Sequence, residues 1–526
     1  MLSRRSLLAG TAAASLARPS LARAAGTGTL RFVPRTDIGI LDPIWTTALI
    51  TRNHGFMVYD TLFGQDAAFR ASPQMLEGYT TAGDGLTWTL VLRDGLLWHD
   101  GERVLARDCV ASIRRWGARD AYGQALLAAT NELSAPDDKT ILFRLKAPFP
   151  FLPDALGKSA TYMPAMMPER LAAKGPTVQI TEIVGSGPFR FKADERVPGS
   201  RTVYERFAGY RPRESGTPSR TAGPKRVHFD RVEWVTMPDG SVAAGALKAG
   251  EIDWWDYPIV DLLPSLKRPD ITVRVLDPNG QMNILRLNHL QPPFDNPEIR
   301  RALLSAVDQA DFMTAVSGEE KALWRDDVGI FCPETPLATP LPAGTFGGAR
   351  DLPAVARRIR EAGYRGEPVA LIVASDFPVH RALADVGADL MRKVGLNVDY
   401  QSVDWGTVQQ RRFKKEPVDK GGWSAFFTAW DGADMLNPAG HLSLRGNGPN
   451  AWFGWPTDPK LETLRDEWFV APDLAAEKRI AADLQAQALI SVPYVPLGQN
   501  FQPTAYRSNL TGLLDGFATF WNVRRT

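Results

Sequence analysis

The sequence predicts an α/β protein built from two or more domains. Short strand-like segments alternate with amphipathic helical segments along the whole chain, and no repeat of fixed period interrupts them. The composition, with 44% hydrophobic and 23% charged residues, is typical of a globular protein. A chain of 526 residues exceeds what one hydrophobic core usually serves, so more than one domain is expected.

Residues 1–24 have the pattern of an export signal. The segment Ser3–Leu8 resembles a twin-arginine motif, an apolar stretch follows from Leu7 to Ala17, and Ala22-Arg23-Ala24 provides a cleavage site. This apolar stretch is far shorter than the roughly 18–20 residues that a membrane-spanning helix needs, and no later segment reaches that length. We expect a twin-arginine signal peptide and a soluble, periplasmic mature protein.

The charge balance argues against nucleic acid or anionic lipid as a partner. Cleavage after residue 24 removes four arginines and no acids, so 61 basic and 59 acidic residues become 57 and 59. Binding to phosphate-rich surfaces requires clustered excess lysine and arginine. Two cysteines, Cys109 and Cys332, are present, and the sequence leaves open whether they form a disulfide, because it does not fix their separation.

In the first half of the chain, antiparallel strands are expected around tight turns. Residues 87–92 alternate apolar and polar side chains, and Asp-Gly turns follow at 94–95 and 100–101. Residues 103–120 then have helical spacing, and residues 139–150 read as another strand that ends in prolines.

The second half is richer in helices. Helical periodicity predicts helices over 296–313, 352–364, 380–395 and 473–491, and strands are expected at 369–374 and 397–403. A strand, a helix and a second strand at this spacing indicate a parallel βαβ unit. Ligands on such sheets bind beyond the carboxyl ends of the strands.

The stretch WSAFFTAWDGADMLNP, residues 423–438, combines a strand-like aromatic run with acids. We expect Trp423, Phe426 and Phe427 to pack in the sheet core. Trp430 falls where the strand gives way to a loop, which favours a position in a binding pocket. Asp431 and Asp434 have two interpretations: they hold a ligand, or they cap a following turn.

Catalytic motifs are missing from the sequence. The six histidines stand apart without H-E-x-x-H spacing, and neither a G-x-S-x-G elbow nor a phosphate-binding glycine loop occurs. We therefore predict no enzyme activity, metal or cofactor. A secreted glycosidase that uses Asp431 or Asp434 is the enzyme alternative, since that chemistry needs only two carboxylates and aromatic sugar platforms.

Several segments carry a more specific pattern when they are taken in chain order. They are GILDPIWTT (39–47), MVYDTLF (57–63), LRDGLLWHDGERVLARDCVASIRRW (92–116), VGSGPFRF (184–191), ERFAGYRP (205–212), ALKAGEIDWWDYP (246–258) and LRLNHLQPPFDNPEIRRALLSAVDQADFM (285–313). Together they resemble the extracellular solute-binding proteins of the peptide/nickel class (family 5), which deliver ligands to ABC importers. The resemblance runs over almost the whole mature chain.

The resemblance implies a two-lobed clamshell of α/β type with an extra subdomain on the first lobe. Residues 25–282 and 497–526 would form the first lobe, with 74–184 as its subdomain, and residues 283–496 the second lobe. The lobes would close on a ligand, and the closed monomer would be recognised by the permease subunits of an ABC importer in the inner membrane.

The resemblance also places the candidate ligand-binding residues around the cleft. Trp405, like Trp430, follows a second-lobe strand, and Trp45, Trp255 and Tyr257 belong to the first lobe, with Trp255 and Tyr257 expected to face Trp430. The full set of candidates is Trp45, Trp255, Tyr257, Asn283, Trp405, Trp430, Asp431 and Asp434.

Two departures from the family pattern concern the ligand. The loop that can supply an arginine for a peptide carboxylate reads Ser375-Asp376-Phe377-Pro378 here, and Asn437-Pro438 replaces a frequent Asp-Pro. With acids and without a cation evident in that loop, we expect an amine-bearing or neutral ligand rather than a dianion. A short peptide held by its amino end is the first expectation, and an amine-bearing small molecule or an oligosaccharide is the alternative.

Overall fold

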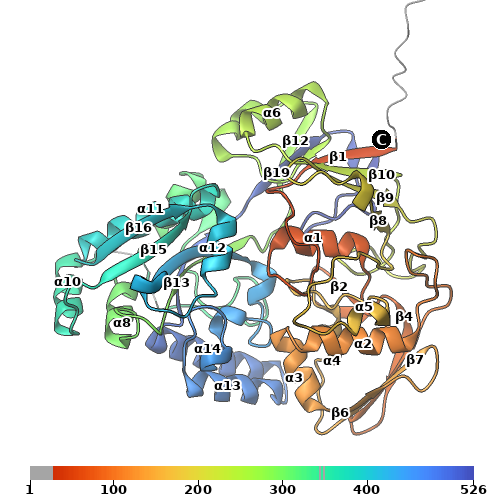
Figure 1. Ribbon diagram of the computed structural model, residues 1–526, viewed down its shortest axis with the longest axis horizontal. Helices are drawn as coiled ribbons and strands as arrows, with labels where there is room; N and C mark the ends of the chain where they lie inside the picture. The colour runs from red at the N-terminus through yellow and green to blue at the C-terminus, as the bar shows by residue number, and fades with distance from the viewer. Residues whose placement is uncertain (1–27, 343–344, 347–349) are drawn as a thin grey trace, which may run out of the picture.

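Two separate mixed β-sheets form the cores of two lobes that lie side by side (Figure 1). The structure is a computed structural model that describes residues 28–342, 345–346 and 350–526. The predicted signal peptide, residues 1–24, lies outside the described residues. Within the described part of the chain, none of the helices combines the length and hydropathy needed to cross a membrane.

The first lobe contains a seven-stranded sheet in the order β12-β19-β11-β1-β10-β9-β8. Its strands are β1 (Thr29–Val33), β8 (Phe189–Phe191), β9 (Arg201–Arg206), β10 (Arg231–Val235), β11 (Trp254–Trp255), β12 (Ile271–Val275) and β19 (Pro503–Arg507). Helices α1 (Leu49–Val58), α6 (Gly240–Ala249) and α7 (Leu263–Leu266), and the short pair β20 (Leu510–Thr511) and β21 (Arg524–Arg525), belong to the same lobe. The strand β1 is parallel to both of its neighbours, β10 and β11.

The subdomain of the first lobe is a four-stranded antiparallel sheet with helices packed against it. Its elements are β4 (Leu76–Thr81), β5 (Thr87–Leu92), β6 (Thr130–Ser134), β7 (Thr140–Leu145), α2 (Ala106–Gly117), α3 (Ala121–Ala129), α4 (Leu152–Gly157) and α5 (Glu169–Ala172). A small hairpin of β2 (Phe63–Gln65) and β3 (Ala71–Pro73) precedes it. The strands and the helix expected over 87–150 are therefore present, inside the proposed range 74–184.

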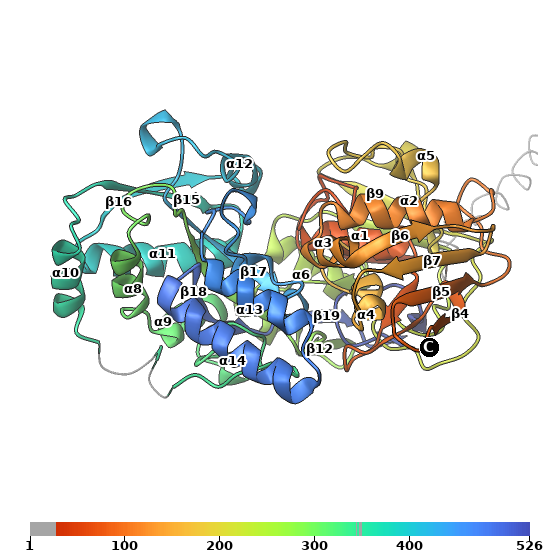
Figure 2. The ribbon, with the colours of Figure 1, turned by 90° about the horizontal axis from the view of Figure 1, so that it is seen from below.

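The second lobe contains a six-stranded sheet in the order β14-β18-β13-β17-β15-β16. Its strands are β13 (Gln281–Leu287), β14 (Trp324–Arg325), β15 (Pro368–Ala374), β16 (Asn397–Val403), β17 (Ala425–Asp431) and β18 (Tyr494–Asn500), and its helices are α8 (Pro297–Leu304), α9 (Gln309–Ser317), α10 (Leu352–Glu361), α11 (Pro378–Lys393), α12 (Trp405–Arg411), α13 (Pro459–Phe469) and α14 (Leu474–Ser491). The predicted parallel βαβ unit is confirmed as β15–α11–β16. Figure 2 shows α13 and α14 on the side of this lobe that borders the first lobe.

The helix predicted over 296–313 is instead two helices, α8 and α9. The Asp308 carboxylate accepts a hydrogen bond from the backbone N–H of Ala310 and so begins a new helix. The cap at Asp308 therefore divides this stretch into two helices, although the periodicity of its apolar residues predicts one continuous helix.

The two lobes are joined by two crossings of the chain, at residues 276–280 and 501–502. The boundaries expected at 283 and 497 therefore fall inside β13 and β18, because both strands extend beyond them. Asn283 lies at a register shift between these two strands, and its Nδ2 donates to Asn500 Oδ1 at 2.8 Å.

The aromatic residues of β17, together with Trp423 just before it, divide between the two faces of the second sheet. Phe427 packs in the main second-lobe core, with its ring 6.3 Å from that of Phe312. Trp423 and Phe426 face the other side, in a small cluster with Val408 and Trp455. All three are buried, as expected for sheet-core residues.

Candidate functional site: a cavity between the lobes

A cavity of about 130 Å³ lies between the two lobes, and we call it the central cavity. Its first-lobe wall comes from residues 35–51, and its second-lobe wall from the end of β17, the segments that follow β15 and β16, and the side chains of Gln281 and Trp452. Trp405 and Trp430, which were predicted from strand ends, both line it. The second-lobe wall consists of Gln281, Phe377, His380, Trp405, Gln409, Arg412, Thr428, Ala429, Trp430 and Trp452.

Aromatic rings cover much of this second-lobe wall. The Trp430 and Trp452 rings meet edge to face at 5.0 Å between centroids. The His380 ring stacks on Phe377 at 4.4 Å and lies 4.8 Å from Trp405. The cavity therefore offers flat apolar surfaces on which an organic ligand can stack.

The position of Trp405 is set by local hydrogen bonds at the start of α12. Asp404 caps the helix by accepting from the backbone N–H of Thr407 at 2.9 Å. Asp376, in the loop after β15, accepts from the backbone N–H of Trp405 at 2.8 Å. Asp376 is thus committed to the backbone of this loop.

Two arginines that the sequence reasoning missed also line the central cavity, Arg35 from the first lobe and Arg412 from the second. Arg35 Nε lies 3.7 Å from Asp256 Oδ2, and its guanidinium lies over the Tyr257 ring at 4.5 Å. The sequence did contain a signal for Arg412. It lies seven positions after Trp405, and this spacing places two residues on the same face of a helix.

Arg412 is 6% exposed and surrounded by rings. Its guanidinium carbon lies 4.5 Å from the Phe453 ring centroid and 5.7 Å from that of Trp405. Burial lowers the pKa of Arg412 to about 10, which leaves it cationic at neutral pH. Burial, together with the charges of Arg35 and Arg412, lowers the pKa of His380 to about 3, so this histidine is neutral.

Asp431 and Asp434 lie off the central cavity, and each bonds to a group of the first lobe. Arg52 Nη1 donates to Asp431 Oδ2 at 2.6 Å, and the Thr161 backbone N–H and hydroxyl donate to Asp434 Oδ1 at 3.0 and 2.6 Å. Both acids, which we predicted as ligand contacts, are thus hydrogen-bonded to the first lobe in this structure. Asp431 also accepts from the backbone N–H of Ala433, which is the turn-capping role considered as the alternative.

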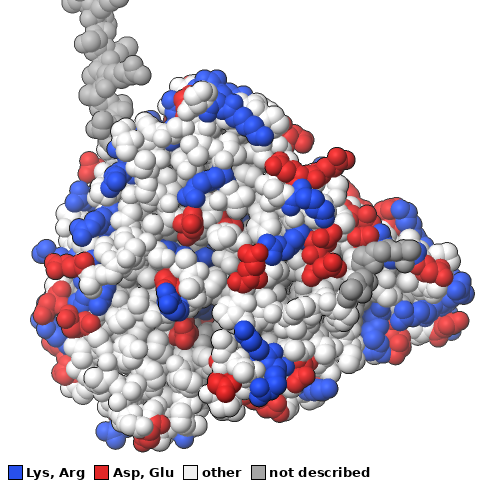
Figure 3. All heavy atoms as spheres, turned by 180° about the vertical axis from the view of Figure 1, so that it is seen from behind, with Lys and Arg blue, Asp and Glu red and all other residues white. Residues whose placement is uncertain are grey.

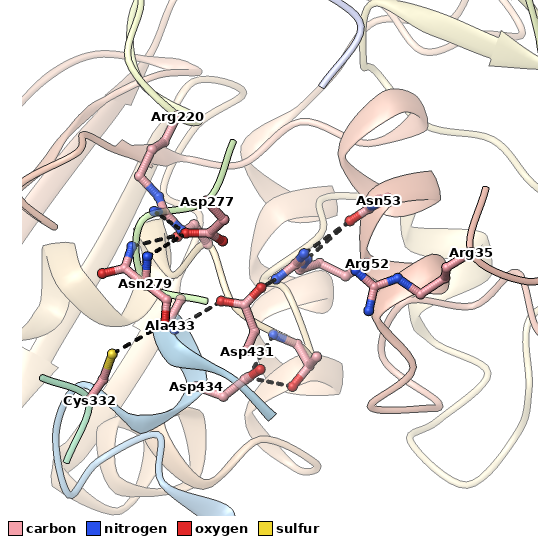
Figure 4. Close-up of polar contacts among 12 residues, drawn as sticks. Arg35, Arg52, Asn53, Arg220, Asp277, Asn279, Cys332, Asp431, Ala433 and Asp434 are labelled. Carbon is pink, nitrogen blue, oxygen red and sulfur yellow. Dashed lines mark hydrogen bonds and ion pairs between the residues drawn. The ribbon is translucent and has the colours of Figure 1, made fainter. Parts of the chain in front are cut away.

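The surroundings of Asp431 are rich in charge (Figure 4). Burial alone would favour the neutral acid, but the charges of Arg52 and Arg220 outweigh it, and the pKa of Asp431 lies below its ordinary value. Burial and the negative charge of Asp431 instead raise the pKa of Asp434 to about 6. Arg220 pairs with Asp277 at 3.8 Å beside the first crossing.

The remaining candidates lie outside the central cavity. Trp45 is half-buried under the Arg119 guanidinium, which lies 5.1 Å from its ring. Trp255 packs in a first-lobe core cluster with residues of α6, because its side chain points to the opposite face of the sheet from Trp254. Tyr257 donates from its hydroxyl to Gln281 Oε1 at 2.6 Å, next to the cavity.

A second hollow, of about 480 Å³, lies between the subdomain and the second lobe. Tyr122, Phe151, Lys158, Asp434 and Trp468 are among its lining residues. The Phe151 and Trp468 rings stack across this interface at 4.5 Å. The two lobes are thus in contact here as well as at the Arg52–Asp431 pair.

Comparison with known proteins identifies the family. Residues 70–452 match the bacterial extracellular solute-binding proteins, family 5 Middle. This chain belongs to that family. It is 37% identical to a probable peptide ABC transporter periplasmic-binding protein, y4tO, of Sinorhizobium fredii, over 100% of this chain and 99% of the relative.

Solved structures support the family-5 fold. AgaA of A. tumefaciens R10, in complex with agropinic acid, superposes with a TM-score of 0.79 at 23% identity, covering 95% of this chain and 99% of that one. DppA of Helicobacter pylori, in complex with the peptide STSA, has a TM-score of 0.77 at 20% identity, covering 95% and 98%. The two-lobed fold that the sequence resemblance implied is confirmed.

Both cysteines are buried and unpaired in this family-5 chain, Cys109 in α2 and Cys332 beside the Asn279 carbonyl. Within the described residues no three His, Cys, Asp or Glu side chains gather in a way that could hold a metal ion.

Proposed function

We propose that this family-5 protein captures a small organic ligand in the central cavity and presents it, with the lobes closed, to the permease of an ABC importer. The observation that carries the proposal is the position of Trp405 and Trp430. Two flat rings from the second lobe and residues 35–51 of the first lobe line the same cavity. Closure around a ligand then buries both rings against it.

The size of the cavity supports a compact ligand. In this closed form the central cavity holds about 130 Å³. That is close to the ~150 Å³ of a protein cavity that accepts benzene. Relatives are named for peptides and AgaA is bound to agropinic acid, so a short peptide or an opine-like molecule suits the family.

Binding can be tested by thermal shift and small-angle scattering. A panel of dipeptides, amines, sugars and organic acids should include compounds that raise the melting temperature of the purified protein. Those compounds should also keep its radius of gyration small, and Trp430→Ala should weaken both effects. A panel without a single stabilising compound would contradict the proposal. Chemical conversion of a bound compound would favour the enzyme alternative.

We propose further that the mature protein acts as a monomer in the periplasm, without catalytic activity, after export by the twin-arginine route. The charge distribution suits a freely diffusing carrier, because acidic and basic side chains are interspersed on the face in Figure 3. Replacing both arginines of the motif (Arg4→Lys with Arg5→Lys) should leave the precursor in the cytoplasm. Normal export of this double variant would exclude the twin-arginine route.

A further inference from the structure

We propose that Arg412 binds a carboxylate of the ligand, and that the central cavity therefore selects small organic anions with an apolar or aromatic body. This inference rests on the proposed function and adds a ligand class to it. It differs from the expectation of an amine, which rested on Asp376, Asp431 and Asp434 and on the lack of an arginine in the loop Ser375–Pro378.

The bonding of Arg412 differs from that of other buried arginines in the same lobe. Arg286 donates to four backbone carbonyls, those of Ser443, Trp452, Phe453 and Pro493, and Arg465 donates to three. Arg412, in contrast, forms no ion pair or side-chain hydrogen bond with any residue that the structure describes, and its Nε is buried without a partner. A buried cation is costly unless it is paired, so Arg412 lacks an anion that a ligand can bring.

The other unsatisfied groups on the wall are also hydrogen-bond donors. The indole N–H groups of Trp430 and Trp452 are buried without acceptors among the described residues, and the Nε of Arg35 lies 3.7 Å from its ion-pair partner Asp256 Oδ2, beyond hydrogen-bond distance. The one further orphan of this wall, His380 Nδ1, donates or accepts according to its tautomer. A carboxylate, which has only acceptor sites, complements such a wall, whereas an ammonium group has only donors.

The acids near the cavity do not cancel this preference. Asp37 lines the cavity, but its carboxylate accepts from the Gly199 backbone N–H at 2.8 Å and from the Thr236 hydroxyl at 3.4 Å. Asp256 does not line the cavity, and its ion pair with Arg35 neutralises part of that charge. Arg412 is therefore the main anchor, and Arg35 assists it from the opposite lobe.

A matched set of probes separates charge from shape. The compounds 3-phenylpropionate, 3-phenylpropionamide and 3-phenylpropylamine share one ring and one chain length and are anionic, neutral and cationic. Calorimetric titration of the full mature protein should give affinity for the carboxylate at least ~10-fold above the amide, as expected for a charge-assisted hydrogen bond. The amine should bind more weakly than the amide.

Arg412→Gln should remove the preference for carboxylate over amide. Arg411→Gln is the matched control, because Arg411 is the adjacent residue but donates to Gln401 Oε1 and the Gly422 carbonyl. This control should keep the preference. If Arg412→Gln does not fold, Arg412→Lys tests the same point, since it keeps the charge, loses the planar fork and should retain only part of the preference.

The outcomes distinguish the two proposals. Carboxylate selectivity that is lost in Arg412→Gln and kept in Arg411→Gln supports the inference. Tighter binding of the amine or the amide than of the carboxylate would overturn the inference and leave the proposed function standing. Carboxylate selectivity that persists in Arg412→Gln would have the same consequence. If neither these probes nor the wider panel of peptides, sugars and acids binds the wild-type protein, both proposals fail.

Discussion

The Arg52 guanidinium on α1 donates to the Asp431 carboxylate at the end of β17 across 2.6 Å, joining the two lobes through a buried ion pair. Both side chains are almost fully shielded from solvent, with 1% and 6% of their surface exposed. An ion pair of this kind exists only when the lobes are together. It therefore contributes to the closed form without touching the ligand.

Asp431→Asn and Arg52→Gln should both destabilise the closed protein. Removing one member of a buried pair leaves the other charge without compensation, at a cost of about 3–5 kcal/mol. We expect a lower melting temperature for each variant without ligand, a larger radius of gyration, and a double variant that loses less than the sum of the two. If Asp431→Asn weakened binding while the unliganded melting temperature and radius stayed unchanged, Asp431 would be a ligand contact instead.

Asp434→Asn should change the pH dependence of stability. The pKa of Asp434 is raised to about 6 by burial and by the charge of Asp431, above the ordinary value of 3.8. Between these values the folded protein binds more protons than the unfolded chain, so the stability due to the protonated acid is present at low pH. It is lost as the pH rises through about 6.

The Asn variant keeps an oxygen that can accept from Thr161 but does not titrate. Its stability relative to the wild type should therefore improve as the pH rises from about 4 to about 7, by on the order of 2–3 kcal/mol for a shift of about two units. Chemical denaturation across this range measures the difference. A difference independent of pH would contradict the raised pKa.

Trp430→Ala and Phe427→Ala should impair different properties of the protein, ligand binding and stability respectively, although the two residues are only three positions apart. Phe427 lies in the second-lobe core, and its truncation should cost about 3–5 kcal/mol of stability. Trp430 lines the central cavity, so its truncation should weaken ligand binding by ~10-fold or more with a smaller loss of stability. Denaturation and titration of the two variants side by side test this. Equal losses of stability with unchanged binding would place Trp430 in the core.

Asn283→Ala should lower stability and leave ligand affinity unchanged. Asn283 Nδ2 donates to Asn500 Oδ1 beside the crossings, and Asn500 Nδ2 already has no partner among the described residues. Loss of the bond should cost about 1–3 kcal/mol, because a buried amide oxygen loses its donor. A large loss of affinity with unchanged stability would return Asn283 to the set of ligand contacts.

The sequence predicted the elements that depend on local pattern. Apolar periodicity located the parallel βαβ unit around α11, and the ordered family segments predicted the two lobes and the subdomain. The pattern failed at residues 296–313, where the Asp308 cap divides one periodic stretch into α8 and α9. It also placed the lobe boundaries a few residues inside β13 and β18, because strand ends depend on pairing with a distant partner.

For the site, the sequence predicted that Trp405 and Trp430 lie at the carboxyl ends of second-lobe strands, since a strand and the loop after it are local features. In the structure Trp405 follows β16, and Trp430 is the second-last residue of β17. Only the tertiary structure decided what those loops meet. Arg52 and Asp431 are 379 positions apart, and their contact turns an acid expected to hold a ligand into an interlobe bond. Arg35 and Arg412 reach one cavity from different lobes, and Arg412 is left unpaired by its surroundings. Only charged side chains that are not paired within the protein can bind a ligand. Contacts between distant parts of the chain decide which side chains stay unpaired, so composition alone does not determine them.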